Sequence, residues 1–272
     1  MSDVIPISKT KHSGFGWLLS ENYSFAAQDT SVPIVIDEIS NIIPTLPMAF
    51  RKRTDQAEKI AYELVALLSP VAKRNLFVKP DGSWLTGYIP AKLRTYPFSL
   101  RTASETGQPV VCFDQASGLM TQTSSPDFKQ FFTEDGKPSP VFTNVITLMQ
   151  QYEQRRVQTL TAVETLAEFD LLSPWKIVLK NDAGRKRSVR GLFKVNTEAL
   201  HKVGAESLPK LHKTGALAIA YAQLLSEQRA QTFSELLKTQ GELQKKEVES
   251  VTLGNIDALF GNKSDVLNLD NF

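Results

Sequence analysis

Five residues within a short stretch combine aromatic rings with a cation. We call them the aromatic ledge: Trp84, Tyr88, Arg94, Tyr96 and Phe98. Aromatic rings stack on sugars, bases or proline-rich peptides, and an arginine adds cation–π contact, so the ledge could bind a ligand or a partner protein. Pro90 and Pro97 restrict their own φ and keep the preceding residues extended, which predicts a rigid surface. Rings that close a small core produce the same pattern, and that interpretation stays open.

Basic residues surround the tip of an expected hairpin. They are Lys180, Arg185, Lys186, Arg187 and Arg190. Cations at such a tip could contact phosphate oxygens, which makes a nucleic-acid-binding module one alternative for the function. Charge along a hairpin edge also prevents unwanted strand pairing. We favour this structural interpretation and do not expect nucleic acid as the partner.

Small apolar clusters recur among polar residues at the end of the chain. They contain Leu259, Phe260, Leu267, Leu269 and Phe272. This pattern is typical of a short docking peptide on a flexible tail. An acidic and apolar ending would also suit a C-terminal export signal, so both roles stay open.

Residues for catalysis or metal binding are scarce. The chain has three histidines and one cysteine, none at metal-ligand spacing, so we predict no metal and no cofactor. Cys112 lies in an apolar run, which favours a core thiol over a nucleophile. Asp81, Glu134 and Asp135 fall in turns, where carboxylates bond their own backbone. The glycine patterns of nucleotide sites and the nucleophile elbow are missing, and no acid, base or nucleophile neighbours the ledge in sequence, so we predict no catalytic residue.

The composition is that of a soluble globular protein, with 42% hydrophobic and 22% charged residues in 272. A net charge of +2 is too balanced to indicate nucleic acid or an anionic membrane. The longest apolar run, 216–222, is far shorter than the ~20 residues that span a bilayer. The N-terminus lacks the pattern of a secretory signal, and one cysteine cannot form an internal disulfide. We predict a cytoplasmic protein, with signal-less secretion to the cell surface as the alternative.

The elements that must position these residues favour an α+β fold, with antiparallel hairpins packed against several amphipathic helices. Hairpins are expected at 76–88 and 175–195, each around a glycine-containing turn. Apolar residues at helical spacing predict a helix at 54–68 and a long one near 140–170, which Ser139 would cap.

The remaining segments complete this layout. The polar run 152–156 of the long helix is expected to add surface charge. Thr214 is a candidate N-cap of a later helix, and Gly241 is expected to break the helical pattern. We predict one α+β domain over 1–238 and a flexible tail over 239–272.

Short motifs occur in a consistent order from about residue 4 to residue 230. They are Tyr23-x-Phe25-Ala26, Pro33 with Glu38, Pro47-x-x-Phe50, Asn75-Leu76-Phe77-Val78, Gly87-Tyr88-Ile89-Pro90, Arg94-x-Tyr96-Pro97-Phe98, Phe132-x-x-Asp135-Gly136-x-Pro138, Phe169-x-Leu171-Leu172, and Gly215-Ala216-Leu217 with Tyr221 and Leu224-Leu225-Ser226. Together they resemble the SapC family, named from a bacterial surface-layer gene cluster. The resemblance implies association with surface-layer or outer-membrane uptake systems, and it brings no catalytic residue with it. The segment 54–68 and the tail beyond about residue 240 depart from the family pattern.

Two hypotheses from different classes follow. The first is a non-enzymatic accessory protein of such a system, which docks a protein partner, for instance a cell-surface or secretion component, through the aromatic ledge or the tail. The second is an enzyme of unrecognised type that acts on carbohydrate or peptide in a pocket under the ledge. A cleft with convergent titratable groups would favour the enzyme, whereas a filled core beneath Tyr88 and Tyr96 would count against it.

Overall fold

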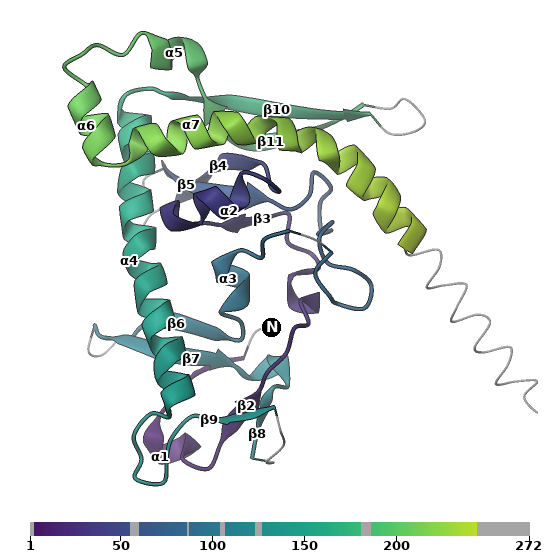
Figure 1. Ribbon diagram of the computed structural model, residues 1–272, viewed down its shortest axis with the longest axis vertical. Coiled ribbons are helices and arrows are strands. Elements are labelled where there is room, and N and C mark those ends of the chain that lie inside the picture. The colour runs from purple at the N-terminus through teal and green to yellow at the C-terminus, as the bar shows by residue number, and fades with distance from the viewer. Residues whose placement is uncertain are drawn as a thin grey trace, which may run out of the picture.

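The computed structural model describes residues 3–54, 60–85, 87–103, 107–122, 127–180 and 186–243. Within these residues the chain has the predicted α+β fold, with three antiparallel sheets arranged along one long helix, α4 (Pro140–Glu168) (Figure 1). The largest sheet lies near the C-terminal end of α4, and the two small sheets lie near its N-terminal end.

The largest sheet has five strands in the order β10-β11-β4-β5-β3, and all neighbours are antiparallel. The strands are β3 (Ser31–Pro33), β4 (Met48–Thr54), β5 (Ile60–Leu67), β10 (Leu172–Lys180) and β11 (Lys186–Val195). The pair β10 and β11 confirms the hairpin predicted at 175–195. Phe50 and Leu64 face each other in the register of β4 and β5, and both are buried, so the middle of this sheet belongs to the main core.

Two three-stranded sheets, β1-β7-β6 and β8-β2-β9, surround a second core. This end of the molecule contains β1 (Val4–Pro6), α1 (Lys9–His12), β2 (Gly16–Leu18), β6 (Phe98–Thr102), β7 (Pro109–Asp114), η3 (Gln115–Ser117), β8 (Met120–Thr121) and β9 (Phe128–Gln130). The second core is mainly aromatic: Trp17, Phe98, Phe113, Phe131, Phe132, Phe142 and Met149. Edge-to-face pairs such as Trp17 and Phe98, with centroids 5.0 Å apart, stabilise it beyond area burial.

Helix α4 begins where the sequence predicts. The Ser139 hydroxyl accepts a hydrogen bond from the Phe142 amide at 3.1 Å, and Pro140 occupies the first turn, where its missing N–H costs nothing. Phe142 packs in the second core, while Val163 and Leu166 pack in the main core. Because a helix rises ~1.5 Å per residue, the 29 residues of α4 reach from one core to the other.

Short helices complete the fold. They are η1 (Ser24–Ala26), η2 (Ile36–Glu38), α2 (Ile39–Ile42), α3 (Ala91–Arg94), α5 (Thr197–His201), α6 (Leu208–Lys213), α7 (Ala216–Ser226), η4 (Glu227–Thr232) and the helical residues 233–243. The N-cap of α7 is Gly215 at a φ of 81°, one residue after the predicted Thr214. The Thr214 hydroxyl instead donates to the Lys210 carbonyl at the end of α6, at 3.0 Å. The break predicted at Gly241 is wrong, because helical backbone continues through it.

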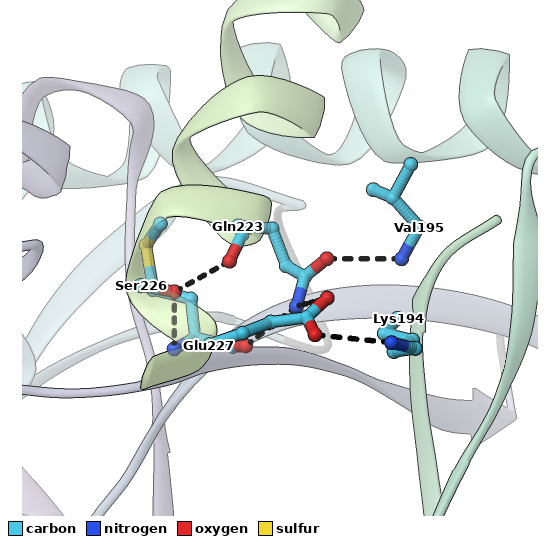
Figure 2. A network of polar contacts seen from close by, with 6 residues as sticks. Lys194, Val195, Gln223, Ser226 and Glu227 are labelled. Atoms are coloured by element: carbon cyan, nitrogen blue, oxygen red, sulfur yellow. Dashed lines mark hydrogen bonds and ion pairs between the residues drawn. The ribbon is translucent and has the colours of Figure 1, made fainter. Parts of the chain in front are cut away.

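Helix α7 completes the main sheet where two strands separate. The register of β11 and β4 ends at Phe193 and Phe50. Beyond that point the Gln223 side chain accepts from the Val195 amide at 2.9 Å and donates to the Met48 carbonyl at 3.3 Å (Figure 2). The Ser226 hydroxyl accepts from the Met48 amide at 3.0 Å. Side chains of α7 therefore satisfy backbone groups that a neighbouring strand would otherwise pair.

The segment predicted as a helix at 54–68 is a strand where the structure describes it, so that prediction is wrong. Leu64, Val65, Ala66 and Leu67 are consecutive and all buried, since both faces of β5 are covered. An apolar run buried on both faces resembles a buried helix in periodicity, which is why spacing alone misassigned it.

The hairpin predicted at 76–88 is reduced to one bridge. Val78 pairs with Trp84 around a turn in which Gly82 has a φ of 83°. The positive φ favours glycine, and a Cβ at this position would also displace the Asn22 side chain. Ladder pairing does not extend to Tyr88.

The boundary between 238 and 239 stays a prediction. Gln240, two residues beyond it, is buried, and its amide donates to the carbonyls of Leu76 at 2.8 Å and Val78 at 3.1 Å.

Candidate functional site

The aromatic ledge does not form one continuous surface. Phe98 is only 7% exposed and packs in the second core, with its ring centroid 5.1 Å from that of Phe113. Trp84 is half-buried, stacks on Phe77 at 5.5 Å and meets Tyr23 edge-on at 5.7 Å. For these two rings the core interpretation accounts for the contacts, and a partner would not reach the face of Phe98.

Tyr88 and Arg94 form a pair that is open to solvent. The guanidinium carbon of Arg94 lies 5.2 Å from the centroid of the Tyr88 ring, and its Nη2 donates to the Tyr88 hydroxyl at 2.7 Å. Arg94 Nε also donates to the Ile89 carbonyl at 3.1 Å. These contacts hold the Arg94 cation at a defined place on the surface.

Tyr96 borders a recess that we call the apolar groove. Its ring stacks on Phe25 with centroids 3.7 Å apart and planes 14° from parallel. The recess encloses about 180 Å³, and Leu19, Val141 and Leu148 line it together with these two rings. Among the described residues that line it, Arg94 is the one charged residue.

A larger recess, the charged cavity, lies between α4, β5, β6 and α3 and encloses about 410 Å³. Its apolar lining includes Ile34, Leu64, Phe98, Leu100, Met149 and Leu160. The ionisable residues among its described lining are Glu63, Lys92, Arg101, Tyr152, Glu153 and Arg156. Thr95 and Phe98 line both recesses, so the segment 87–98 separates the apolar groove from the charged cavity.

Each carboxylate of the charged cavity has an arginine partner. Arg156 holds Glu153 with two hydrogen bonds, Nε to Oε2 at 2.8 Å and Nη2 to Oε1 at 2.5 Å. Arg51 donates to Glu63 Oε1 from Nε at 3.0 Å and from Nη2 at 2.7 Å. Hydrogen bonding to Glu153 raises the pKa of Arg156. Both acids are therefore neutralised by fixed cations.

Two further ionisable groups of the cavity are perturbed. Desolvation lowers the pKa of Lys92, the Glu153 carboxylate raises it, and Arg156 and Arg101 lower it. Burial raises the pKa of Tyr152, with the Glu38 carboxylate adding to the effect. Glu38 is 4% exposed and accepts from the amides of Val35 at 3.1 Å and Ala91 at 2.5 Å, so it anchors the start of α3.

Sequence reasoning missed this cavity. It assigned 152–156 to surface charge and found no acid or base beside the ledge in sequence, whereas Tyr152, Glu153 and Arg156 lie in the same cavity as Lys92. The missed signal was helical spacing: Met149, Glu153 and Arg156 follow one another at intervals of four and three, which places them on one face of α4. Glu63 on β5 and Arg101 on β6 are distant from α4 in sequence, so no local spacing connected them with this helix.

The structure places the other residues predicted as binding sites only in part. Arg190 is exposed on β11, and Lys180 pairs with Lys186 and Leu179 with Arg187 in the hairpin register. Arg185 lies outside the described residues, as do the five apolar residues predicted in the tail. Cys112 is buried, and burial raises the pKa of its thiol.

The described part of the chain contains no group of three His, Cys, Asp or Glu side chains arranged to hold a metal ion. In the same residues, none of the helices combines the length and apolar character needed to cross a bilayer.

The fold and the two recesses define an α+β protein with an apolar groove and a charged cavity on opposite sides of one segment. The chain belongs to the SapC family, since the family model matches residues 7–233. This match confirms the resemblance seen in the sequence motifs. No curated protein and no solved structure matches the chain.

Proposed function

We propose that this protein is a non-enzymatic accessory protein that docks a partner protein through the apolar groove. The association with a bacterial surface-layer or outer-membrane uptake system, which the family resemblance implies, is part of the same proposal. The supporting observation is the clustering of exposed apolar side chains at one place.

Four of the nine large hydrophobic side chains that the described residues expose line this groove. They are Leu19 at 56%, Phe25 at 38%, Val141 at 41% and Leu148 at 42% exposed. Single exposed apolar residues are common and need no explanation, but a contiguous set around a recess is typical of interaction sites. The set comes from the β2 end, η1 and the first turns of α4, so a rigid scaffold positions it.

The charge of the groove indicates the chemistry of the partner. Arg94 at its edge would pair with a carboxylate, so an apolar peptide segment that carries an acidic residue is the expected occupant. Residues 259–272 of this chain have the same character, with Asp265 and Asp270 among apolar residues. The tail is therefore a competitor that an experiment must separate from a partner.

The experiment places a photo-crosslinking amino acid at Leu148 in the groove and, as a matched control, at Leu225, which is 68% exposed on α7. We expect a discrete partner adduct from position 148 that is absent at 225, is lost in Leu19→Glu and persists when 250–272 are deleted. Equal adducts at both positions, or an adduct only to the protein's own tail, would overturn the proposal.

The enzyme alternative has one observation in its favour, the convergence of Lys92, Tyr152 and Glu153 in the charged cavity. However, the two hydrogen bonds from Arg156 occupy both oxygens of Glu153, which disfavours a role for this carboxylate as a general base. We therefore retain binding as the proposed function.

A further inference from the structure

The charged cavity has the size and lining of a small-molecule site. Its volume of about 410 Å³ falls in the lower part of the ~300–1,000 Å³ range typical of ligand pockets. Ile34, Leu64, Phe98 and Met149 are buried and form apolar walls. Such walls fit a small apolar body and leave recognition to the few polar groups at the rim.

The rim has more positive than negative charge that is free to act on a ligand. Glu63 and Glu153 are each bound by an arginine, as described above. Lys92 on α3 and Arg101 on β6 also line the cavity, and neither side chain makes a hydrogen bond or ion pair with another described residue. Among the described residues, these two cations therefore face the cavity without a direct ion-pair partner, and Glu153, which acts on Lys92, is itself held by Arg156.

Lys92, Arg101 and Arg156 line the same cavity, so their positive charges repel one another. Desolvation lowers the pKa of Lys92 most, the Glu153 carboxylate raises it, and Arg156 and Arg101 lower it further. An anion between Lys92 and Arg101 would relieve this repulsion and gain charge-assisted hydrogen bonds.

One more polar group beside the cavity lacks a partner. Ser99 on β6 lines the cavity, and its hydroxyl is buried without a hydrogen bond to any described residue. Ser99 lies between Phe98 on the apolar wall and Arg101 at the rim in sequence, so the same strand supplies apolar, hydroxyl and cationic groups.

We propose that the charged cavity binds a small organic anion with an apolar body, whose carboxylate or phosphate group lies between Lys92 and Arg101 and whose apolar part lies against Ile34, Leu64 and Met149. This site is separate from the apolar groove, and the proposal does not depend on the docking of a partner protein.

Titration calorimetry of the full-length protein with four probes tests the proposal. The probes are octanoate, octyl phosphate, octanol and inorganic phosphate. We expect at least one of the two charged octyl compounds to bind about tenfold or more tightly than octanol and inorganic phosphate, and their comparison distinguishes carboxylate from phosphate recognition. If octanol binds as tightly as the charged octyl compounds, the cations do not contribute to recognition. If inorganic phosphate binds as tightly as they do, the apolar walls do not contribute. Either result would overturn the proposal.

Variants locate the site. Lys92→Gln with Arg101→Gln should weaken the charged probe about tenfold and leave octanol unchanged. Lys202→Gln removes an exposed cation outside the cavity and should bind like the wild type. Leu160→Trp partly fills the cavity without removing a charge and should weaken every octyl probe. Unchanged affinity in both the double variant and Leu160→Trp, with unaltered thermal unfolding, would overturn the proposal.

Discussion

The side chains of the segment 87–98 are divided among different environments. Tyr96 and Arg94 border the apolar groove, Lys92 borders the charged cavity, and Phe98 lies in the second core between them. The short turn α3 produces this division, since successive residues of a helix point about 100° apart. The segment is thus a partition between two recesses, and only part of it is available to a partner.

Tyr152 should contribute to the loss of stability at alkaline pH. The pKa of Tyr152 is raised above its ordinary 10.0, first by burial and then by Glu38. The folded protein keeps the phenol proton at a pH where the unfolded chain loses it, so this contribution is complete below pH 10 and is lost as the pH rises toward the folded pKa. The free energy of unfolding should fall by about 1.4 kcal/mol per pH unit from this group.

Denaturant unfolding of Tyr152→Phe at increasing pH measures this contribution. The variant should lose less stability than the wild type above pH 10, because phenylalanine has no proton to lose. Tyr221→Phe removes a hydroxyl from a residue that is 54% exposed and should follow the wild type. Identical pH profiles for Tyr152→Phe and the wild type would contradict the assignment.

At the scale of elements, helix α7 replaces a missing stretch of strand pairing. Gln223 is fully buried and joins the Val195 amide to the Met48 carbonyl, where β11 and β4 no longer pair. A leucine at this position would leave both backbone groups without partners and without water. Gln223→Leu should therefore reduce the free energy of unfolding by about 2–4 kcal/mol.

Gln228→Leu is the matched control for this prediction. Gln228 is exposed in η4, two residues beyond the end of α7, so the same chemical change there should alter stability by less than about 0.5 kcal/mol. Chemical denaturation of both variants measures the difference. Comparable losses in the two variants would mean that the buried network has no special role.

At the scale of the whole molecule, α4 joins two cores that are otherwise built from different strands. The main core takes Val163 and Leu166 from this helix, and the second core takes Phe142 and Met149. Neither half of the helix can remain packed when its neighbouring core is lost, so we expect one cooperative unfolding transition.

The three tryptophans separate the two cores experimentally. Trp17 lies in the second core, whereas Trp84 and Trp175 pack against the main core. In Trp84→Phe with Trp175→Phe, fluorescence reports only on Trp17, and its denaturant midpoint should coincide with that of far-ultraviolet circular dichroism. Trp17→Phe reports on the other core and should show the same coincidence. A Trp17 transition at lower denaturant than the dichroism would show that the second core unfolds separately.

Local signals in the sequence determined the elements that depend on neighbouring residues. Ser139 and Pro140 predicted the start of α4 because a helix cap is made by residues three apart. The hairpin at 175–195 was likewise predictable from its turn. The family was predictable from short motifs that occur in a consistent order along the chain.

Only the tertiary structure decided what depends on distant residues. Ile60–Leu67 is a strand because β4 and β3 pair with it and α4 covers it, and periodicity does not contain that information. The charged cavity brings Lys92, Arg101 and Tyr152 together from three elements, although each alone resembles ordinary surface or core. The same holds for the aromatic ledge: its sequence showed that the rings are close together, and the packing decided which of them reach solvent.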